Sequence, residues 1–262
     1  MSSTHYPGLQ ELAEEAARAA GEILLERWQK PPLGVRTKSS DTDPASDADR
    51  AAEVAIITRI RAVRPDDAIV AEEGGLSAGK SGVRWLIDPL DGTVNYLYGI
   101  PQWSVSICAL EGNDAVAGVV FDPVRNELFT ATRGGGARCG DARLAVSTET
   151  EVARVLLIAG FSYVADERGV QARQQAALIP HVRDLRRFGS AALDLAWVAA
   201  GRVDAYMETF ANQWDWAAGT LLVREAGGRV SNVPGVRAGT PGILASGLGV
   251  HDALLALVRA KA

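Results

Sequence analysis

Asp88 and Asp91 are the first residues whose types and spacing could do chemistry. They stand three positions apart in the segment D-P-L-D-G-T, residues 88–93, directly after a short apolar run. Pro89 has no N–H with which to continue a strand ladder, so the segment is predicted to lie at a strand end. The two carboxylates and the carbonyl of Leu90 can converge on one point. Such a set of oxygen donors favours a hard cation of the magnesium kind.

The turn after these carboxylates could hold an anion beside the cation. Gly92 permits a tight turn, and Thr93 can begin a short helix over residues 94–98. The backbone N–H groups of Gly92 and Thr93 would then point at the anion, as at other helix starts. A bound cation beside this turn would favour a small anionic substrate.

More carboxylates are needed to complete such a site, and two segments could supply them. Glu72 and Glu73 follow the strand-like run 68–71. Asp215 stands between two tryptophans just before a predicted helix, where an acidic residue is either a helix cap or a ligand.

The composition excludes several other kinds of protein. Lys plus Arg is 27 and Asp plus Glu is 32, so the net charge is 27 − 32 = −5, which argues against a basic nucleic-acid-binding face. The two cysteines and three scattered histidines exclude a disulfide scaffold and a Cys- or His-rich metal site. No signal peptide or membrane-spanning run is evident, so we expect a cytoplasmic protein.

The elements that must position these residues change in type along the chain. Helical periodicity predicts helices over 8–30 and 44–63, and an antiparallel meander is expected around the hairpin signal Gly112-Asn113. The predicted strands of the first half are 68–71, 83–87, 103–110, 115–121 and 128–132. The second half is predicted to alternate strands at 155–159 and 203–207 with helices at 167–178, 191–200 and 216–226.

This change of pattern predicts two subdomains. The first, 1–139, is of α+β type and carries most candidate ligands. The second, 140–262, is of α/β type and carries Asp215, together with the residues that the resemblance described below places in a substrate pocket. The whole chain is therefore expected to be an α/β protein.

A different class of protein is suggested by the segment Gly74–Ser81, which matches the phosphate-loop pattern G-x-x-x-x-G-K-[ST]. That loop must open a helix, whereas Ser81 is followed by Gly82 and a strand-like run. The surroundings favour a surface hairpin, and a nucleotide-binding protein is kept as the alternative.

Several segments together resemble the inositol monophosphatase family of magnesium-dependent, lithium-sensitive phosphatases. The matching segments run in the order of the family, from the first helix to about Gly228. They are DPASDADRAAE at 43–53, Glu72-Glu73, WLIDPLDGTVN at 85–95, GSAALD at 189–194, GRVDAYME at 201–208 and WDWAAG at 214–219. The resemblance implies a layered αβαβα sandwich of the sugar-phosphatase type, with the metals between its halves.

The resemblance also implies roles for single residues. One Mg²⁺ would be held by Glu73, Asp88 and the Leu90 carbonyl. A second would be held by Asp88, Asp91 and Asp215. A third, more weakly bound ion would be held by Asp49 and Glu73. Thr93 with Glu73 or Asp49 would orient the attacking water, and the N–H groups of Gly92 and Thr93 would bind the phosphate. The positions matching the contacts to the alcohol are Asp91, Gly189, Ser190, Ala191 and Glu208.

The function implied is hydrolysis of a phosphate monoester, with myo-inositol 1-phosphate favoured by GSAALD and Glu208. Fructose 1,6-bisphosphatase and histidinol-phosphate phosphatase are the alternatives within the family. A further alternative is a catalytically inactive regulatory or RNA-polymerase-binding relative, which the presence of all five ligating side chains disfavours. A basic surface patch would be the structural sign of a binding role. The expected partners are a small phosphorylated polyol or sugar and a second copy of the chain as a homodimer, with no nucleic acid and no membrane.

Overall fold

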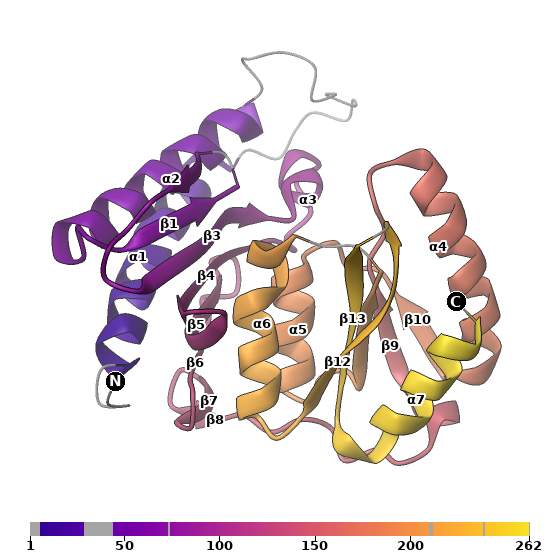
Figure 1. The fold of residues 1–262 in the computed structure, drawn as a ribbon. Coiled ribbons are helices and arrows are strands. Elements are labelled where there is room, and N and C mark those ends of the chain that lie inside the picture. Colours follow the sequence, from indigo (N-terminus) through magenta and orange to yellow (C-terminus); the bar gives the residue numbers. More distant parts are fainter. Residues whose placement is uncertain (1–5, 29–43, 73, 210–211, 238, 262) are drawn as a thin grey trace.

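The structure is a computed structural model that describes residues 6–28, 44–72, 74–209, 212–237 and 239–261 (Figure 1). Its helices are α1 (Tyr6–Arg27), α2 (Pro44–Val63), α3 (Thr93–Leu97), α4 (Ala165–Leu178), α5 (Ala191–Ala199), α6 (Gln213–Glu225) and α7 (Leu248–Lys261). Two short 3₁₀ turns are η2 (Val152–Arg154) and η3 (Ile179–His181). None of the described helices is both long and apolar enough to cross a bilayer.

The first half of the described chain forms an eight-stranded sheet in the order β2-β1-β3-β4-β5-β6-β7-β8. Its strands are β1 (Ala68–Ala71), β2 (Gly75–Ser77), β3 (Val83–Asp91), β4 (Ser104–Glu111), β5 (Asp114–Asp122), β6 (Glu127–Thr132), β7 (Gly136–Cys139) and β8 (Ala142–Arg143). The predicted antiparallel meander is confirmed, with a tight connection at Gly112-Asn113. β1 differs from the meander because it pairs with β3 in parallel.

The second half forms a five-stranded sheet in the order β10-β9-β11-β13-β12. Its strands are β9 (Leu156–Ala159), β10 (Asp184–Arg186), β11 (Ala205–Glu208), β12 (Arg229–Arg237) and β13 (Thr240–Ser246). Only β10, β9 and β11 are parallel, as an alternating α/β pattern predicts. β12 and β13 form an antiparallel hairpin in a stretch for which the sequence pattern made no prediction.

The helices and sheets alternate in five layers, which confirms the αβαβα sandwich (Figure 1). α1 and α2 cover the outer face of the large sheet, α5 and α6 lie between the two sheets, and α4 and α7 cover the outer face of the small sheet. Each helical layer has its own apolar core. α1 shows why: Leu9, Ala13, Ala16, Ala20 and Leu24 recur at helical spacing and are buried.

An irregularity in β3 has a direct effect on the candidate ligands. Asp88 pairs with Ser106 and Asp91 with Ser104, so three steps along β3 face two steps along β4. In a regular strand, residues three apart point to opposite faces. The extra residue of this bulge, next to Pro89, allows both aspartates to line the same pocket. The expectation that the strand ends at Asp88 is therefore corrected, because β3 continues through the bulge to Asp91.

The segment Gly74–Ser81 does not form a phosphate loop. Gly75–Ser77 is strand β2, and the N–H groups of Lys80 and Ser81 both donate to the carbonyl of Asp66. The next element is strand β3 from Val83, so no helix N-terminus is available to bind phosphate. The alternative of a phosphate-loop nucleotide-binding protein is wrong for this reason.

Candidate active site

A pocket of about 620 Å³ opens where the large sheet, the middle helices and the small sheet meet. Ten residues proposed from the sequence line it: Asp88, Leu90, Asp91, Gly92, Thr93, Gly189, Ser190, Ala191, Glu208 and Asp215. Asp49 is buried on α2, and its charge acts on Asp88. Glu73 lies outside the described residues, while its neighbour Glu72 lines the pocket.

Asp88 is the most crowded of the carboxylates. It is 3% exposed, and its Oδ1 accepts a hydrogen bond of 3.0 Å from the backbone N–H of Leu90. Burial raises the pKa of Asp88 well above its usual range, and the nearby charges of Glu72, Asp91 and Asp215 raise it further. A cation at this point would relieve that repulsion.

Asp91 joins the two halves of the molecule. Its carboxylate accepts hydrogen bonds from the Ser190 hydroxyl at 2.6 Å and from the N–H groups of Ala191 and Ala192 at 3.2 and 2.8 Å. Asp91 therefore caps the N-terminus of α5 from the end of a strand in the other sheet. Burial raises the pKa of Asp91, and these three hydrogen bonds oppose the rise.

The sequence left open whether Asp215 caps a helix or binds a ligand, and the structure shows that it caps α6 and also lines the pocket. It stands in the first turn of α6, and its Oδ2 accepts a hydrogen bond of 2.7 Å from the N–H of Asn212, so it takes part in capping that helix. It also lines the pocket, and burial together with the charge of Asp91 raises its pKa well above the usual range. The capping role leaves its second oxygen for a ligand.

The turn at Gly92 fixes Thr93 at the start of α3. Gly92 has φ of 100°, and a Cβ there would lie 3.0 Å from the carbonyl oxygen of Gln102 and 3.2 Å from that of Gly189. The Thr93 hydroxyl donates to the carbonyl of Leu90 at 3.1 Å. One short segment thus holds Asp91, the Leu90 carbonyl and Thr93 together.

Ser190 is placed differently from a simple substrate contact. It is fully buried, and its hydroxyl is directed to Asp91 and lies 3.1 Å from the hydroxyl of Ser104. In this structure Ser190 therefore positions Asp91. Glu208, at the end of β11, accepts a hydrogen bond from the Tyr206 hydroxyl, and burial raises its pKa to about 7.

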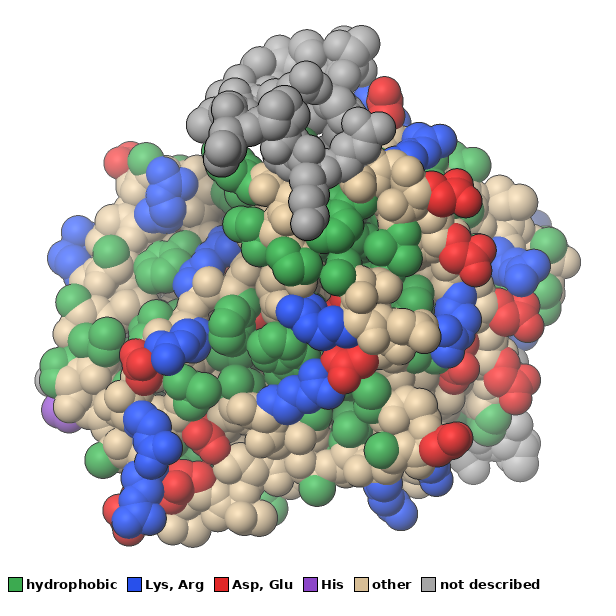
Figure 2. Space-filling model, turned by 180° about the vertical axis from the view of Figure 1, so that it is seen from behind, with side chains coloured by type: hydrophobic (Ala, Val, Ile, Leu, Met, Phe, Trp, Pro, Cys, Tyr) green, Lys and Arg blue, Asp and Glu red, His purple; other side chains and the backbone are tan. Residues whose placement is uncertain are grey.

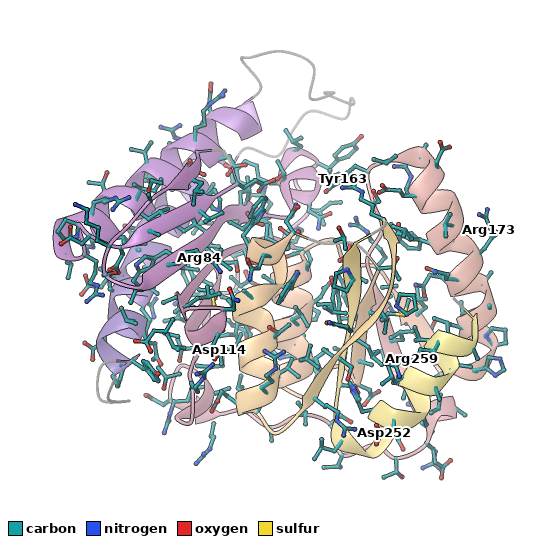
Figure 3. The ribbon with its side chains drawn as sticks, viewed as in Figure 1. Arg84, Asp114, Tyr163, Arg173, Asp252 and Arg259 are labelled. Carbon is teal, nitrogen blue, oxygen red and sulfur yellow. The ribbon has the colours of Figure 1, made fainter. Side chains whose placement is uncertain are left out.

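Sequence reasoning missed Asn95, which anchors α3, and three residues that line the pocket. Asn95 ties α3 to the second half, because its Nδ2 donates to the carbonyls of Gln102 and Phe188, both at 2.7 Å. Arg187 and Tyr163 line the pocket, and Tyr163 is 71% exposed, between α3 and α4 in Figure 3. Asp194 also lines it. Asp194 and Asn95 belong to segments already singled out, so their polar character was a usable signal, whereas Arg187 and Tyr163 had none.

No group of three Asp, Glu, His or Cys side chains within the described ranges is arranged to hold a metal ion. The described carboxylates of Asp91 and Asp215 are turned toward backbone N–H groups. The donor set is nevertheless suited to a hard ion, because it consists of carboxylates whose pKa values are raised by burial and, in addition, by their mutual repulsion.

The layered αβαβα sandwich is a fold of the sugar-phosphatase type. The sequence model of the inositol monophosphatase family matches residues 8–261. The chain belongs to the inositol monophosphatase family.

Relatives with known names and structures agree with this assignment. The chain is 45% identical to the Nus factor SuhB of Pasteurella multocida over 226 residues, which cover 86% of this chain and 85% of the relative. The structure of Mycobacterium tuberculosis SuhB is similar with a TM-score of 0.85 and 37% identity, covering 97% of each chain. Inositol monophosphatase from Anabaena (Nostoc) sp. PCC 7120 gives 0.85 at 34% identity, covering 98% of this chain and 97% of its own.

Proposed function

We propose that this protein is a magnesium-dependent phosphate monoester hydrolase whose substrate is myo-inositol 1-phosphate. The observation that carries the proposal is the convergence of Asp88 and Asp91 from β3 with Asp215 from α6 on one pocket. The pocket of about 620 Å³ has room for a phosphorylated polyol or sugar. Membership of the inositol monophosphatase family supports the reaction class.

The ligand assignment follows the resemblance. Glu73, Asp88 and the Leu90 carbonyl would hold one Mg²⁺, and Asp88, Asp91 and Asp215 the second. Asp49 and Glu73 would hold a third ion. Bound magnesium would supply positive charge against the phosphate and acidify a water molecule.

The side chains of the chain itself would orient the reactants. Thr93, held by its bond to the Leu90 carbonyl, would position the attacking water with Glu73 or Asp49 as the proton acceptor. The N–H groups of Gly92 and Thr93 would bind the phosphate. The alcohol part of the substrate would contact Asp91, Gly189, Ser190 and Ala191. Glu208 would accept a hydrogen bond from one of its hydroxyl groups.

The proposal is tested by phosphate release from a panel of esters with magnesium, with and without lithium. The panel is myo-inositol 1-phosphate, fructose 1,6-bisphosphate, histidinol phosphate and adenosine 3′,5′-bisphosphate. We expect the inositol ester to give the highest kcat/KM and lithium to inhibit. A higher kcat/KM for fructose 1,6-bisphosphate or histidinol phosphate would transfer the assignment to that activity.

The variant Asp88→Asn tests the metal-binding carboxylates. It should lower kcat by at least about a hundredfold while the protein stays folded, because a neutral amide binds a hard cation poorly. The matched control is Asp252→Asn on α7, whose carboxylate pairs with Arg229 far from the pocket (Figure 3). Full activity of Asp88→Asn in a magnesium titration would refute the assignment.

A second role in binding other proteins is favoured by one observation, the name Nus factor given to the relatives. On the face drawn in Figure 2, Lys and Arg side chains alternate with Asp and Glu rather than forming a basic patch. We place this role second to catalysis. It predicts that the Asp88→Asn protein still binds RNA polymerase in a pull-down, and loss of that binding together with catalysis would contradict two separate roles.

The proposal includes a cytoplasmic homodimer, in line with the resemblance. Light scattering of the purified protein would give twice the monomer mass of 27.7 kDa.

A further inference from the structure

Asp194 is a buried carboxyl in the pocket with no role assigned so far. It stands in the first turn of α5, one turn after Ser190, whose carbonyl accepts its N–H at 2.9 Å. Its side chain is almost fully buried, with 2% of the residue exposed, yet the residue lines the pocket.

The surroundings of Asp194 do not satisfy its carboxyl group. Within the described part of the chain, Oδ1 is shielded from solvent and has no hydrogen-bond partner. By contrast, Asp91 lies at the N-terminus of the same helix and accepts three hydrogen bonds there. A buried carboxyl without donors lowers stability, so a hydrogen-bonding group on a bound ligand would stabilise it.

The charges near Asp194 also disfavour an ionised carboxylate at this position. Burial raises the pKa of Asp194 well above its usual range, and Asp91 and Glu208 raise it further, while Arg187 opposes them. A protonated carboxyl both donates and accepts hydrogen bonds, whereas an ionised carboxylate only accepts them. A hydroxyl group has the same two capacities and is a matched partner in either protonation state.

Glu208 shows that this side of the pocket is built for polar contacts. Its carboxyl lies beside Gly160, where a Cβ would come 2.1 Å from Glu208 Cδ, so only glycine leaves the room. Gly160 follows β9 and Glu208 ends β11, so both lie at the carboxyl ends of parallel strands. Asp194 faces them from α5, and its charge interacts with that of Glu208.

We propose that Asp194 contacts the substrate and forms a hydrogen bond with a hydroxyl of its alcohol part. This hydroxyl would lie next to the one that donates a hydrogen bond to Glu208. The pocket would then select phosphate esters of polyols over alkyl or aryl esters. This inference rests on the proposed function and narrows its substrate class. The discrimination has a physical cause, because an ester without the hydroxyl leaves the buried carboxyl without a partner.

The test compares two esters in the same protein. Asp194→Ala should raise KM for myo-inositol 1-phosphate about tenfold or more, and should change KM for phenyl phosphate by less than about twofold. Asp194→Asn keeps a polar group and should retain part of the affinity. An equal change for both esters, or no change for either, would overturn the inference.

Stability provides a readout that separates contact from scaffolding. Because Asp194→Asn replaces a buried carboxyl, which Asp91 and Glu208 repel when it is ionised, with a neutral amide, its Tm should rise by a few degrees while its selectivity falls. The matched control is Asp204→Asn, since the Asp204 carboxylate accepts bonds from Ser147 Oγ at 2.5 Å and Leu156 N at 2.7 Å outside the pocket. That control should lower Tm and leave the ratio of the two esters unchanged. A lowered Tm in Asp194→Asn with unchanged selectivity would show a structural role instead.

Binding measurements separate this inference from the hydrolase assignment. Titration calorimetry with myo-inositol 1-phosphate and magnesium needs no turnover. If wild type releases no phosphate from any ester, the proposed function fails, and a fall of at least about fivefold in the affinity of Asp194→Ala still supports the contact. Equal affinities, or no binding by wild type, overturn it.

Discussion

Single residues in this pocket are held at a cost in stability, and Glu208 shows how that cost depends on pH. Its carboxyl is partly buried at the end of β11 and accepts a bond from Tyr206. Burial raises its pKa from 4.5 to about 7. Below pH 4.5 the group is protonated in folded and unfolded chains alike and costs nothing. Between pH 4.5 and about pH 7 the folded state holds a proton that the unfolded state releases, so stability falls as pH rises.

Glu208→Gln should remove this pH dependence. The free energy of unfolding of the variant relative to wild type should rise by roughly 2 kcal/mol between pH 4.5 and pH 8, discounted for the partial exposure. Urea titrations in metal-free buffer at the two pH values would measure it. Glu149→Gln is the control of opposite sign, because bonds from the N–H groups of Glu151 and Thr150 lower the pKa of Glu149. A pH-independent difference for Glu208→Gln would refute the burial argument.

At the scale of elements, the site depends on a bulged strand end and a short helix that follow one another. The bulge in β3 turns Asp88 and Asp91 into the same pocket, and the left-handed Gly92 starts α3 immediately after them. Asn95 then fastens α3 to the carbonyls of Gln102 and Phe188. A change in this turn would therefore move several site groups together.

Gly92→Ala tests that turn. Both Gly92 (φ 100°) and Gly82 (φ 87°) are left-handed, so alanine strains either by about 1–2 kcal/mol. Gly82 has open space around a Cβ, whereas Gly92 would meet two backbone carbonyls. Gly92→Ala should therefore lower the free energy of unfolding by at least about 1 kcal/mol more than Gly82→Ala, and should lower kcat as well. Chemical denaturation compares the two, and equal losses would contradict the packing argument.

At the scale of the whole molecule, the middle helical layer brings together residues from both sheets. α5 carries Asp194, and its N-terminus donates hydrogen bonds to Asp91 from the large sheet, while α6 carries Asp215. The two helices approach closely because Gly219 has no side chain, and a Cβ there would lie 2.5 Å from Leu195 Cβ. The spacing of this layer thus sets the distance between the site groups on the two helices.

Gly219→Ala should force α5 and α6 apart. The variant should lose about 1–3 kcal/mol of unfolding free energy and much of its activity. Gly169→Ala in α4 is the matched helical control, because the nearest atom to its Cβ is an Arg173 nitrogen at 3.8 Å. That control should gain about 0.5–1 kcal/mol from better helix propensity. Thermal unfolding and phosphate release measure both, and a stabilised Gly219→Ala would contradict the close packing.

The sequence by itself determined the local features of this protein. Periodic apolar residues predicted α1 and α2, alternation and turn residues predicted the meander, and D-P-L-D-G-T with W-D-W predicted an acidic site. These features depend on neighbours a few positions apart, so the pattern of residue types is sufficient to find them.

Only the tertiary structure decided how those features meet. The bulge that puts Asp88 and Asp91 into one pocket depends on pairing with β4, and the cap that Asp91 places on α5 joins residues 99 positions apart. The burial of Asp194 and the raised pKa of Glu208 arise from elements of both sheets and the layer between them. Such contacts depend on packing between distant segments, which the spacing of residue types along one chain does not encode.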